Sequence, residues 1–267
     1  MEILSVEYLL GSFLIFVRVS SMMLTAPFFS SAAFPAQVKV FFALITSILL
    51  YPVVPAQNIM IETDSGALFL LTAIIIEVLV GAALGLVGQI IFAGLELAGR
   101  LVSLKIALGF ASVVDTMTQQ QSTIVSNMFS MLAVLVFLSI DGEKIYLMAL
   151  VRSFEVIPLQ QAEIQLAGPY MLELATYLFV IGVQITSPFL IVLFLIDLSL
   201  AIFARIMPQA NIMFIALPIK IGVGFIMLYL VAPFLPVAFE MMFTRMFDFL
   251  EEFIGIMAPP SVERSQI

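Results

Sequence analysis

The sequence of 267 residues contains no cysteine, no histidine and no tryptophan, and only 10% of its residues are charged. Without cysteine and histidine it can form no disulfide, thiol nucleophile, histidine-based triad or zinc site of the usual kind. Lysine and arginine number 10 against 18 acidic residues, so there is no basic patch for a nucleic acid. No glycine-rich phosphate loop ending in Lys-Ser or Lys-Thr occurs, which excludes nucleotide hydrolysis by that route. We expect neither a metal nor a cofactor.

Apolar residues take the place of the missing charge. They make up 63% of the sequence, and the mean hydropathy is +1.22. An average soluble domain carries roughly 25% charged residues, so this chain has too few to cover the surface of a 29.3 kDa globule. Most of its surface must therefore face lipid or other protein, which predicts a membrane protein.

About six apolar segments are long enough to be membrane-spanning helices. A helix rises about 1.5 Å per residue, so about 20 apolar residues cross a hydrocarbon core of about 30 Å. None of the segments alternates with the two-residue period of a barrel strand. Prolines such as Pro188 and Pro218 lie inside them and should kink them. We expect an all-α polytopic membrane protein with segments at 9–29, 38–56, 67–95, 124–150, 174–203 and 212–239.

Charged residues lie within these segments or at their ends. Each would cost about 2.5–3.5 kcal/mol at a bilayer centre, so each should face protein or water. Snorkelling from a span end is the alternative for Arg18 and Lys220. The basic residues divide six to four between the two sides, which leaves the orientation open. We expect polar contacts between helices or subunits from Arg18, Glu77, Asp197, Arg205 and Lys220, and from Gln209 and Asn211 in the turn before residue 212.

Three shorter patterns predict local contacts. Gly81, Gly85 and Gly88 should allow a second helix to approach closely. Glu96 and Arg100 stand four residues apart and can pair on one helix face. Asn211 is a suitable residue to cap the following helix.

A further segment joins the third and fourth apolar stretches. Residues 109–115 form an apolar patch between a glycine and an aspartate, and the polar run Thr118–Thr123 follows. An apolar loop between polar flanks is unfavourable in water. It should be buried in protein or inserted in a cavity, unless it is a short interfacial loop.

Taken in order, these segments resemble the FliR family of flagellar export-gate proteins and its counterparts in virulence type III secretion, the SctT proteins. Two departures are visible: Thr116 stands where members commonly have proline, and Glu143 where many have histidine. The wording of the motifs leans towards the flagellar branch without excluding the other. The resemblance covers about residues 10–240 and is carried by Arg18-Val19-Ser20, Ala26-Pro27-Phe28-Phe29, Pro35, Lys39, Glu77, Gly81, Gly109–Asp115, Asp141-Gly142, Arg205-x-Met207-Pro208-Gln209-x-Asn211 and Pro218-x-Lys220.

The resemblance implies one all-helical export-gate domain, with a FliP-like part over about 1–170 and a FliQ-like part over about 171–267. It implies assembly with FliP-like and FliQ-like subunits, contact with FlhB-like and FlhA-like components and the basal-body ring, and passage of unfolded export substrates. The location would be the bacterial inner membrane, at the flagellar basal body. The family's plug of the closed pore would here be Gly109, Phe110, Ala111, Ser112, Val113, Val114 and Asp115. The implied role is gating without chemistry.

Two other classes of function are weaker alternatives. A proton-coupled secondary transporter of a small solute could use Glu77 or Asp197 as its proton carrier. Such a protein should show an internal repeat, and none is clear between the two halves. An intramembrane enzyme would need an unusual lysine base, and Lys105 has no marked partner motif.

Overall fold

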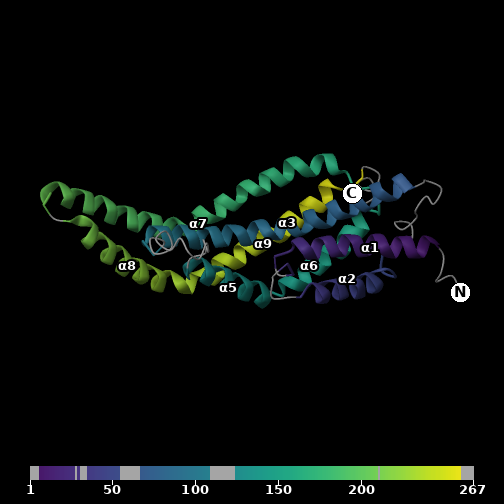
Figure 1. The fold of residues 1–267 in the computed structure, drawn as a ribbon, viewed down its shortest axis with the longest axis horizontal. Helices are drawn as coiled ribbons and strands as arrows, with labels where there is room; N and C mark the ends of the chain where they lie inside the picture. The colour runs from purple at the N-terminus through teal and green to yellow at the C-terminus, as the bar shows by residue number, and fades with distance from the viewer. Residues whose placement is uncertain are drawn as a thin grey trace. The chain divides into compact units, whose positions relative to one another are not determined.

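The computed structural model describes residues 6–27, 29–30, 35–54, 67–108, 124–209 and 211–259. All regular structure in these residues is helical, which confirms the predicted all-α class (Figure 1). The helices are α1 (Val6–Thr25), α2 (Ala36–Leu50), α3 (Ala67–Lys105), α5 (Ile124–Ser139), α6 (Gly142–Val156), α7 (Ile164–Ile206), α8 (Ile212–Val231), the 3₁₀ turn η2 (Ala232–Phe234) and α9 (Leu235–Ile256).

Three helical stretches among the described residues are long and apolar enough to cross a membrane: Leu68–Lys105, Ala167–Ile206 and Phe214–Ile256. The last comprises α8, η2 and α9, so the prolines in this region do not end the stretch. The pair α5 and α6, bent by 69°, could form a fourth span. α3 has 39 residues and α7 has 43. At about 1.5 Å per residue both are about twice as long as a hydrocarbon core of about 30 Å is thick.

The expected segments differ from these helices at several places. α3 continues to Lys105 beyond the expected end at 95, α7 begins at Ile164 before the expected start at 174, and the stretch expected at 212–239 continues through α9 to Ile256.

Two other expected segments are shortened or interrupted. The segment 38–56 is shorter than expected, because α2 has 15 residues and ends at Leu50, just before Pro52. The segment 124–150 is two helices, because Asp141 has a left-handed backbone with φ of 56°. An Asp-Gly pair is a common turn signal, so Asp141 and Gly142 explain the break between the two helices.

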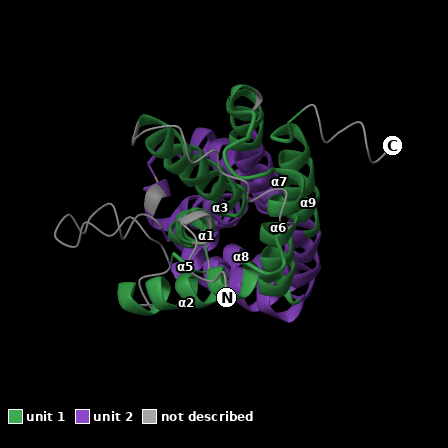
Figure 2. Cartoon of the chain, turned by 90° about the vertical axis from the view of Figure 1, so that its right-hand side faces the viewer, with its two compact units in different colours: residues 1–90, 141–175, 244–267 green, residues 91–140, 176–243 purple. Residues whose placement is uncertain are grey.

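The chain forms two compact units, shown in green and purple in Figure 2. Unit 1 comprises Met1–Ile90, Asp141–Ala175 and Thr244–Ile267, and unit 2 comprises Ile91–Ile140 and Thr176–Phe243. The units are therefore interleaved along the sequence. α3, α7 and α9 each contribute residues to both.

The core of unit 1 forms around α1. Ile15, Val19, Met22 and Ala26 follow the spacing of one helix face, and each is at most 1% exposed. This apolar spacing explains why α1 packs inward although its segment carries an arginine. α2 packs on α1, and α3 also packs on α1 through the glycine-rich stretch of α3.

The core of unit 2 is aromatic. The rings of Phe92, Phe137 and Phe243 meet with centroids 5.2–5.7 Å apart, and Phe129 meets Phe239 at 5.7 Å. These separations are favourable for tilted and edge-to-face aromatic contacts. The cluster joins α5 to the parts of α3 and α9 that belong to this unit.

The outer faces of α7 and α8 in unit 2 are apolar and uncovered. Phe194, Phe214 and Tyr229 are 63%, 78% and 79% exposed. Large exposed apolar surfaces of this kind mark contact with lipid or with other proteins. The structure thus agrees with the composition in describing a polytopic membrane protein.

Candidate functional site

A fully buried ion pair lies in unit 1, between Arg18 of α1 and Glu77 of α3. Arg18 Nε donates to Glu77 Oε2 at 2.5 Å, and both side chains are 0% exposed. Arg18 lies one turn from Leu14 on one side and one turn from Met22 on the other, and both are buried. Helical spacing thus directs the Arg18 side chain into the core. The alternative that this side chain snorkels from the end of a span is therefore wrong.

The remaining polar atoms of the pair bind backbone groups. Arg18 Nη1 donates to the carbonyl oxygens of Ser153 at 3.1 Å and Ile157 at 3.2 Å, and Nη2 also donates to Ile157 at 3.2 Å. Glu77 Oε1 accepts the backbone N–H of Gln160 at 3.0 Å. The guanidinium carbon lies 4.3 Å from the centroid of the Phe154 ring, within cation–π range. Both charges are therefore hydrogen-bonded as well as paired.

These contacts hold the end of α6 and the turn that follows it. Ile157 is the C-cap residue of α6, and its carbonyl has no partner within the helix. Arg18 supplies that partner. Gln160 has a backbone φ of 70°, in the left-handed region that non-glycine residues seldom adopt. The N–H of this residue is the one that Glu77 holds, so the ion pair stabilises an unfavourable turn.

The Arg18–Glu77 cluster, which includes the backbone groups of Ser153, Ile157 and Gln160, links α1, α3 and the end of α6. A buried ion pair gains little over well-packed apolar residues, yet losing one partner costs about 3–5 kcal/mol. Each oxygen of Glu77 already accepts a hydrogen bond from a positioned donor. The arrangement can therefore fix α1, α3 and the end of α6 relative to one another.

A second ion pair lies in unit 2, where Lys220 of α8 binds Asp197 of α7 through Oδ1. The lysine side chain is 24% exposed and the aspartate side chain 40%. The pair therefore links two apolar helices while staying partly open to their surroundings. The structure brings these two predicted residues together across 23 positions of sequence.

The other predicted polar residues lie near the turn between α7 and α8. Arg205 is exposed in the last turn of α7, and Gln209 is exposed in the turn itself. Asn211 stands at the N-cap position of α8, but its side chain makes no capping hydrogen bond. The expected cap is thus wrong. The structure does not join these three residues to the Asp197–Lys220 pair.

The predicted plug, Gly109–Asp115, lies outside the described residues, which end at Leu108 before it and resume at Ile124 after it. At the end of α3, Ile106 is fully buried. A Cβ on Gly224 of α8 would lie 2.6 Å from that of Ile106, too close to fit. Near the start of α5, Ser126 packs against Gly99 with similar closeness, 2.6 Å from Ser126 Cα to an added Cβ. Ile106 and Ser126 are thus both held by close helix contacts within unit 2.

Two local predictions are confirmed. Arg100 Nη2 donates to Glu96 Oε1 at 2.5 Å, and both half-buried side chains lie on one face of α3. A Cβ on Gly85 would lie 2.7 Å from the backbone nitrogen of Ala26, and one on Gly81 would collide with the Arg18 carbonyl. Only glycine allows α3 to approach α1 this closely.

Several residues of the Arg18–Glu77 cluster escaped the sequence reasoning. Ser153, Ile157 and Gln160 contribute backbone atoms, which every residue type has, so no sequence signal marks them. Tyr146 was also missed; its hydroxyl donates to the carbonyl of Leu84 at 2.5 Å, joining α6 to α3. Within the described parts of the chain, no group of three acidic residues is placed to hold a metal ion.

The fold and these clusters define a class: an all-helical polytopic membrane protein whose buried charges pair between helices. Residues 9–246 match the family model of bacterial export proteins, family 1, and the chain belongs to that family. It is 30% identical to the flagellar biosynthetic protein FliR of Pectobacterium carotovorum over 242 residues, covering 90% of each chain. It is 30% identical to FliR of Bacillus subtilis over 219 residues, covering 80% of this chain and 83% of the relative. The FliR of Escherichia coli is 27% identical over 240 residues, covering 90% of each chain. The chain is a flagellar export component.

Proposed function

We propose that this chain is the gating subunit of the flagellar export channel, with the segment Gly109–Asp115 closing the pore at rest. Phe110, Val113 and Val114 would form an apolar constriction, which excludes water and ions by dewetting. An unfolded substrate would displace the segment as it enters. The chain would carry out no chemistry, since the energy for transport would come from other parts of the apparatus.

The observation that carries this proposal is the anchoring of Ile106 and Ser126, which lie in the described helical regions before and after the segment. Ile106 is buried against Gly224, and Ser126 packs against Gly99, so both residues are held by close helix contacts in unit 2. A plug has to return to one position after each passage, and fixed residues on either side favour that return. An apolar segment carried between fixed residues is also costly to leave in water.

We further propose assembly with FliP-like and FliQ-like subunits in the bacterial inner membrane. FlhB-like and FlhA-like components and the basal-body ring would be neighbours. The exposed apolar faces of α7 and α8 support a covering of other protein or lipid. The proposed boundary between a FliP-like part over about 1–170 and a FliQ-like part over about 171–267 falls inside α7.

No observation favours the transporter alternative. A proton carrier needs a carboxylate that can exchange its proton with a solvated pathway. Glu77 is fully buried with both oxygens bonded, and Asp197 is paired with Lys220. Protonating either carboxylate would break an ion pair.

Deleting Gly109–Asp115 tests the gating role. The chain should still assemble, because the contacts at Ile106 and Ser126 are untouched, and the assembled channel should become leaky to small ions. The measurement is ion flux through the purified complex in proteoliposomes. The matched control is Phe110→Leu with Val113→Ile, which keeps the segment apolar and should stay tight. An assembled deletion variant that remains ion-tight would rule out the plug.

A further inference from the structure

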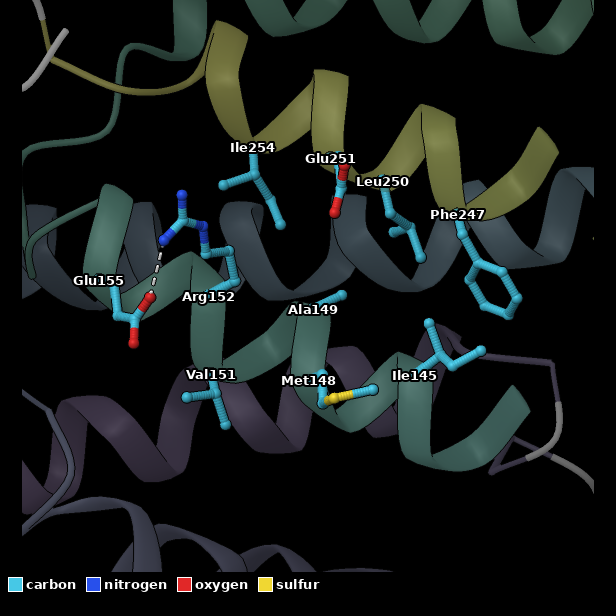
Figure 3. A pocket seen from close by; sticks show the side chains of 10 residues that line it. All are labelled: Ile145, Met148, Ala149, Val151, Arg152, Glu155, Phe247, Leu250, Glu251 and Ile254. Carbon is cyan, nitrogen blue, oxygen red and sulfur yellow. Dashed lines mark hydrogen bonds and ion pairs between the residues drawn. The ribbon is translucent and has the colours of Figure 1, made fainter. Parts of the chain in front are cut away.

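A groove of about 390 Å³ lies in unit 1 between α6 and the last turns of α9 (Figure 3). From α6 it is lined by Ile145, Met148 and Ala149, and from α9 by Phe247, Leu250 and Ile254. On each helix these residues follow a three- and four-residue spacing, so each wall is one apolar helix stripe. Leu250 and Ile254 are only 1% and 2% exposed and form the floor of the groove, so the accessible apolar surface comes from Phe247 and from the α6 side. Two such stripes side by side form the seat for a third helix.

The groove also carries charge. Glu251 of α9 stands between Leu250 and Ile254, and Figure 3 shows its carboxylate directed towards α6. On the α6 side, Arg152 Nη1 donates to Glu155 Oε2 at 3.0 Å. Among the described residues the structure gives Glu251 no ion pair, so the groove has a net charge of one negative unit. Glu251 is exposed in this chain, so its carboxylate is solvated here; once a helix covered the groove, the carboxylate would be costly to bury unless a cation met it.

A neighbouring glycine leaves room for a close approach. Gly255 lies one turn beyond Glu251 on α9 and is exposed. No atom lies within 4 Å of where its Cβ would be. Close helix contacts in membrane proteins use small residues in this way. Gly255 therefore allows another backbone to come near at the level of Glu251.

We propose that this groove binds an apolar helix of a partner subunit that carries one lysine or arginine, which pairs with Glu251. This inference rests on the proposed function, because it needs a multi-subunit assembly. The two apolar stripes fit side chains of a third helix at i, i+3 or i+4 and i+7. The unpaired carboxylate selects a cation. It also disfavours an anionic phospholipid, whose headgroup would meet the same negative charge.

Thiol protection tests whether a partner covers the groove. The native sequence has no cysteine, so Met148→Cys places a single thiol in the wall of the groove, at a position 59% exposed. Its maleimide labelling is compared in three samples: the chain in mild detergent, the chain with phosphatidylethanolamine and phosphatidylglycerol vesicles, and the complex co-expressed with FliP-like and FliQ-like subunits. Labelling should slow about tenfold or more in the complex only. Glu163→Cys, exposed outside the groove, is the reference thiol.

Charge variants test the recognition. Glu251→Gln should lower the equilibrium constant of assembly by about thirtyfold, since losing one member of a covered charge pair is that costly. Ala149→Phe should also block assembly by filling the groove. Asp248→Asn removes an exposed charge from α9 outside the groove and should have no effect. Assembly of Glu251→Arg should be restored when the partner's cation is changed to glutamate.

The possible outcomes separate this inference from the proposed function. If the complex forms but labelling of Met148→Cys is unchanged, or Glu251→Gln assembles as well as Asp248→Asn, the inference is overturned and the proposed function stands. Protection by vesicles alone assigns the groove to lipid and also overturns it. If the native chain does not assemble with these subunits, the proposed function fails, and this inference with it.

Discussion

Breaking the Arg18–Glu77 pair from one side should destabilise unit 1 far more than replacing both residues. In Glu77→Leu, the Arg18 guanidinium stays at 0% exposure with two carbonyl partners and no counter-charge. An uncompensated buried charge of this kind costs about 3–5 kcal/mol. Arg18→Met strands the Glu77 carboxylate in the same way. Each single variant should therefore lose about 3–5 kcal/mol.

The double variant Arg18→Met with Glu77→Leu should lose less than either single variant. No buried charge remains, and apolar side chains of similar volume can fill the space. The N–H of Gln160 loses its acceptor and the carbonyl of Ile157 loses its donor, at about 1–3 kcal/mol for each group. Each single variant already loses one of these bonds in addition to stranding a buried charge. The prediction is therefore a strong, favourable coupling between the two positions.

Thermal unfolding of the purified chain in mild detergent measures this coupling. For a chain of this size, about 1 kcal/mol shifts Tm by about 2–4 °C, so each single variant should lower Tm by about 6–20 °C. The matched control is the exposed pair Arg152–Glu155, whose side chains are 52% and 45% exposed. Glu155→Gln should cost about 0–1 kcal/mol. A double variant whose loss equals the sum of the two single losses would refute the reasoning, because independent sites add.

Two further variants test the packing of each unit, both by the same thermal assay. In unit 1, Gly85→Leu should lower Tm strongly, because the leucine side chain would collide with Thr25 and Ala26. The control Gly168→Ala meets no atom within 4 Å and should be tolerated. Equal effects of the two substitutions on Tm would contradict the close packing of α1 on α3. In unit 2, Phe243→Ala should cost about 3–5 kcal/mol because the ring is fully buried between Phe92 and Phe137. Phe225→Ala, at a position 54% exposed, should change Tm little in detergent, and a larger loss there than at Phe243 would argue against the aromatic core.

The sequence alone determined the features that depend on composition and on short spacing. A charged fraction of 10% and a hydrophobic fraction of 63% are enough to require a membrane protein, whatever the fold. The Glu96–Arg100 pair and the close approach at Gly81 and Gly85 also followed, because helical periodicity relates residues three or four positions apart. The family followed from ordered motifs and from the match over residues 9–246.

Only the tertiary structure decided which charges meet. Arg18 and Glu77 stand 59 positions apart, and the other partners of Arg18 are carbonyls more than 130 positions away. Lys220 could have faced Asp197, another subunit or solvent, and only the packing of α8 on α7 selects one of these. The groove beside Glu251 likewise exists only because α6 and α9 lie side by side. Such contacts escape the sequence because backbone atoms are common to all residues, and because a charge indicates that it needs a partner without indicating which one.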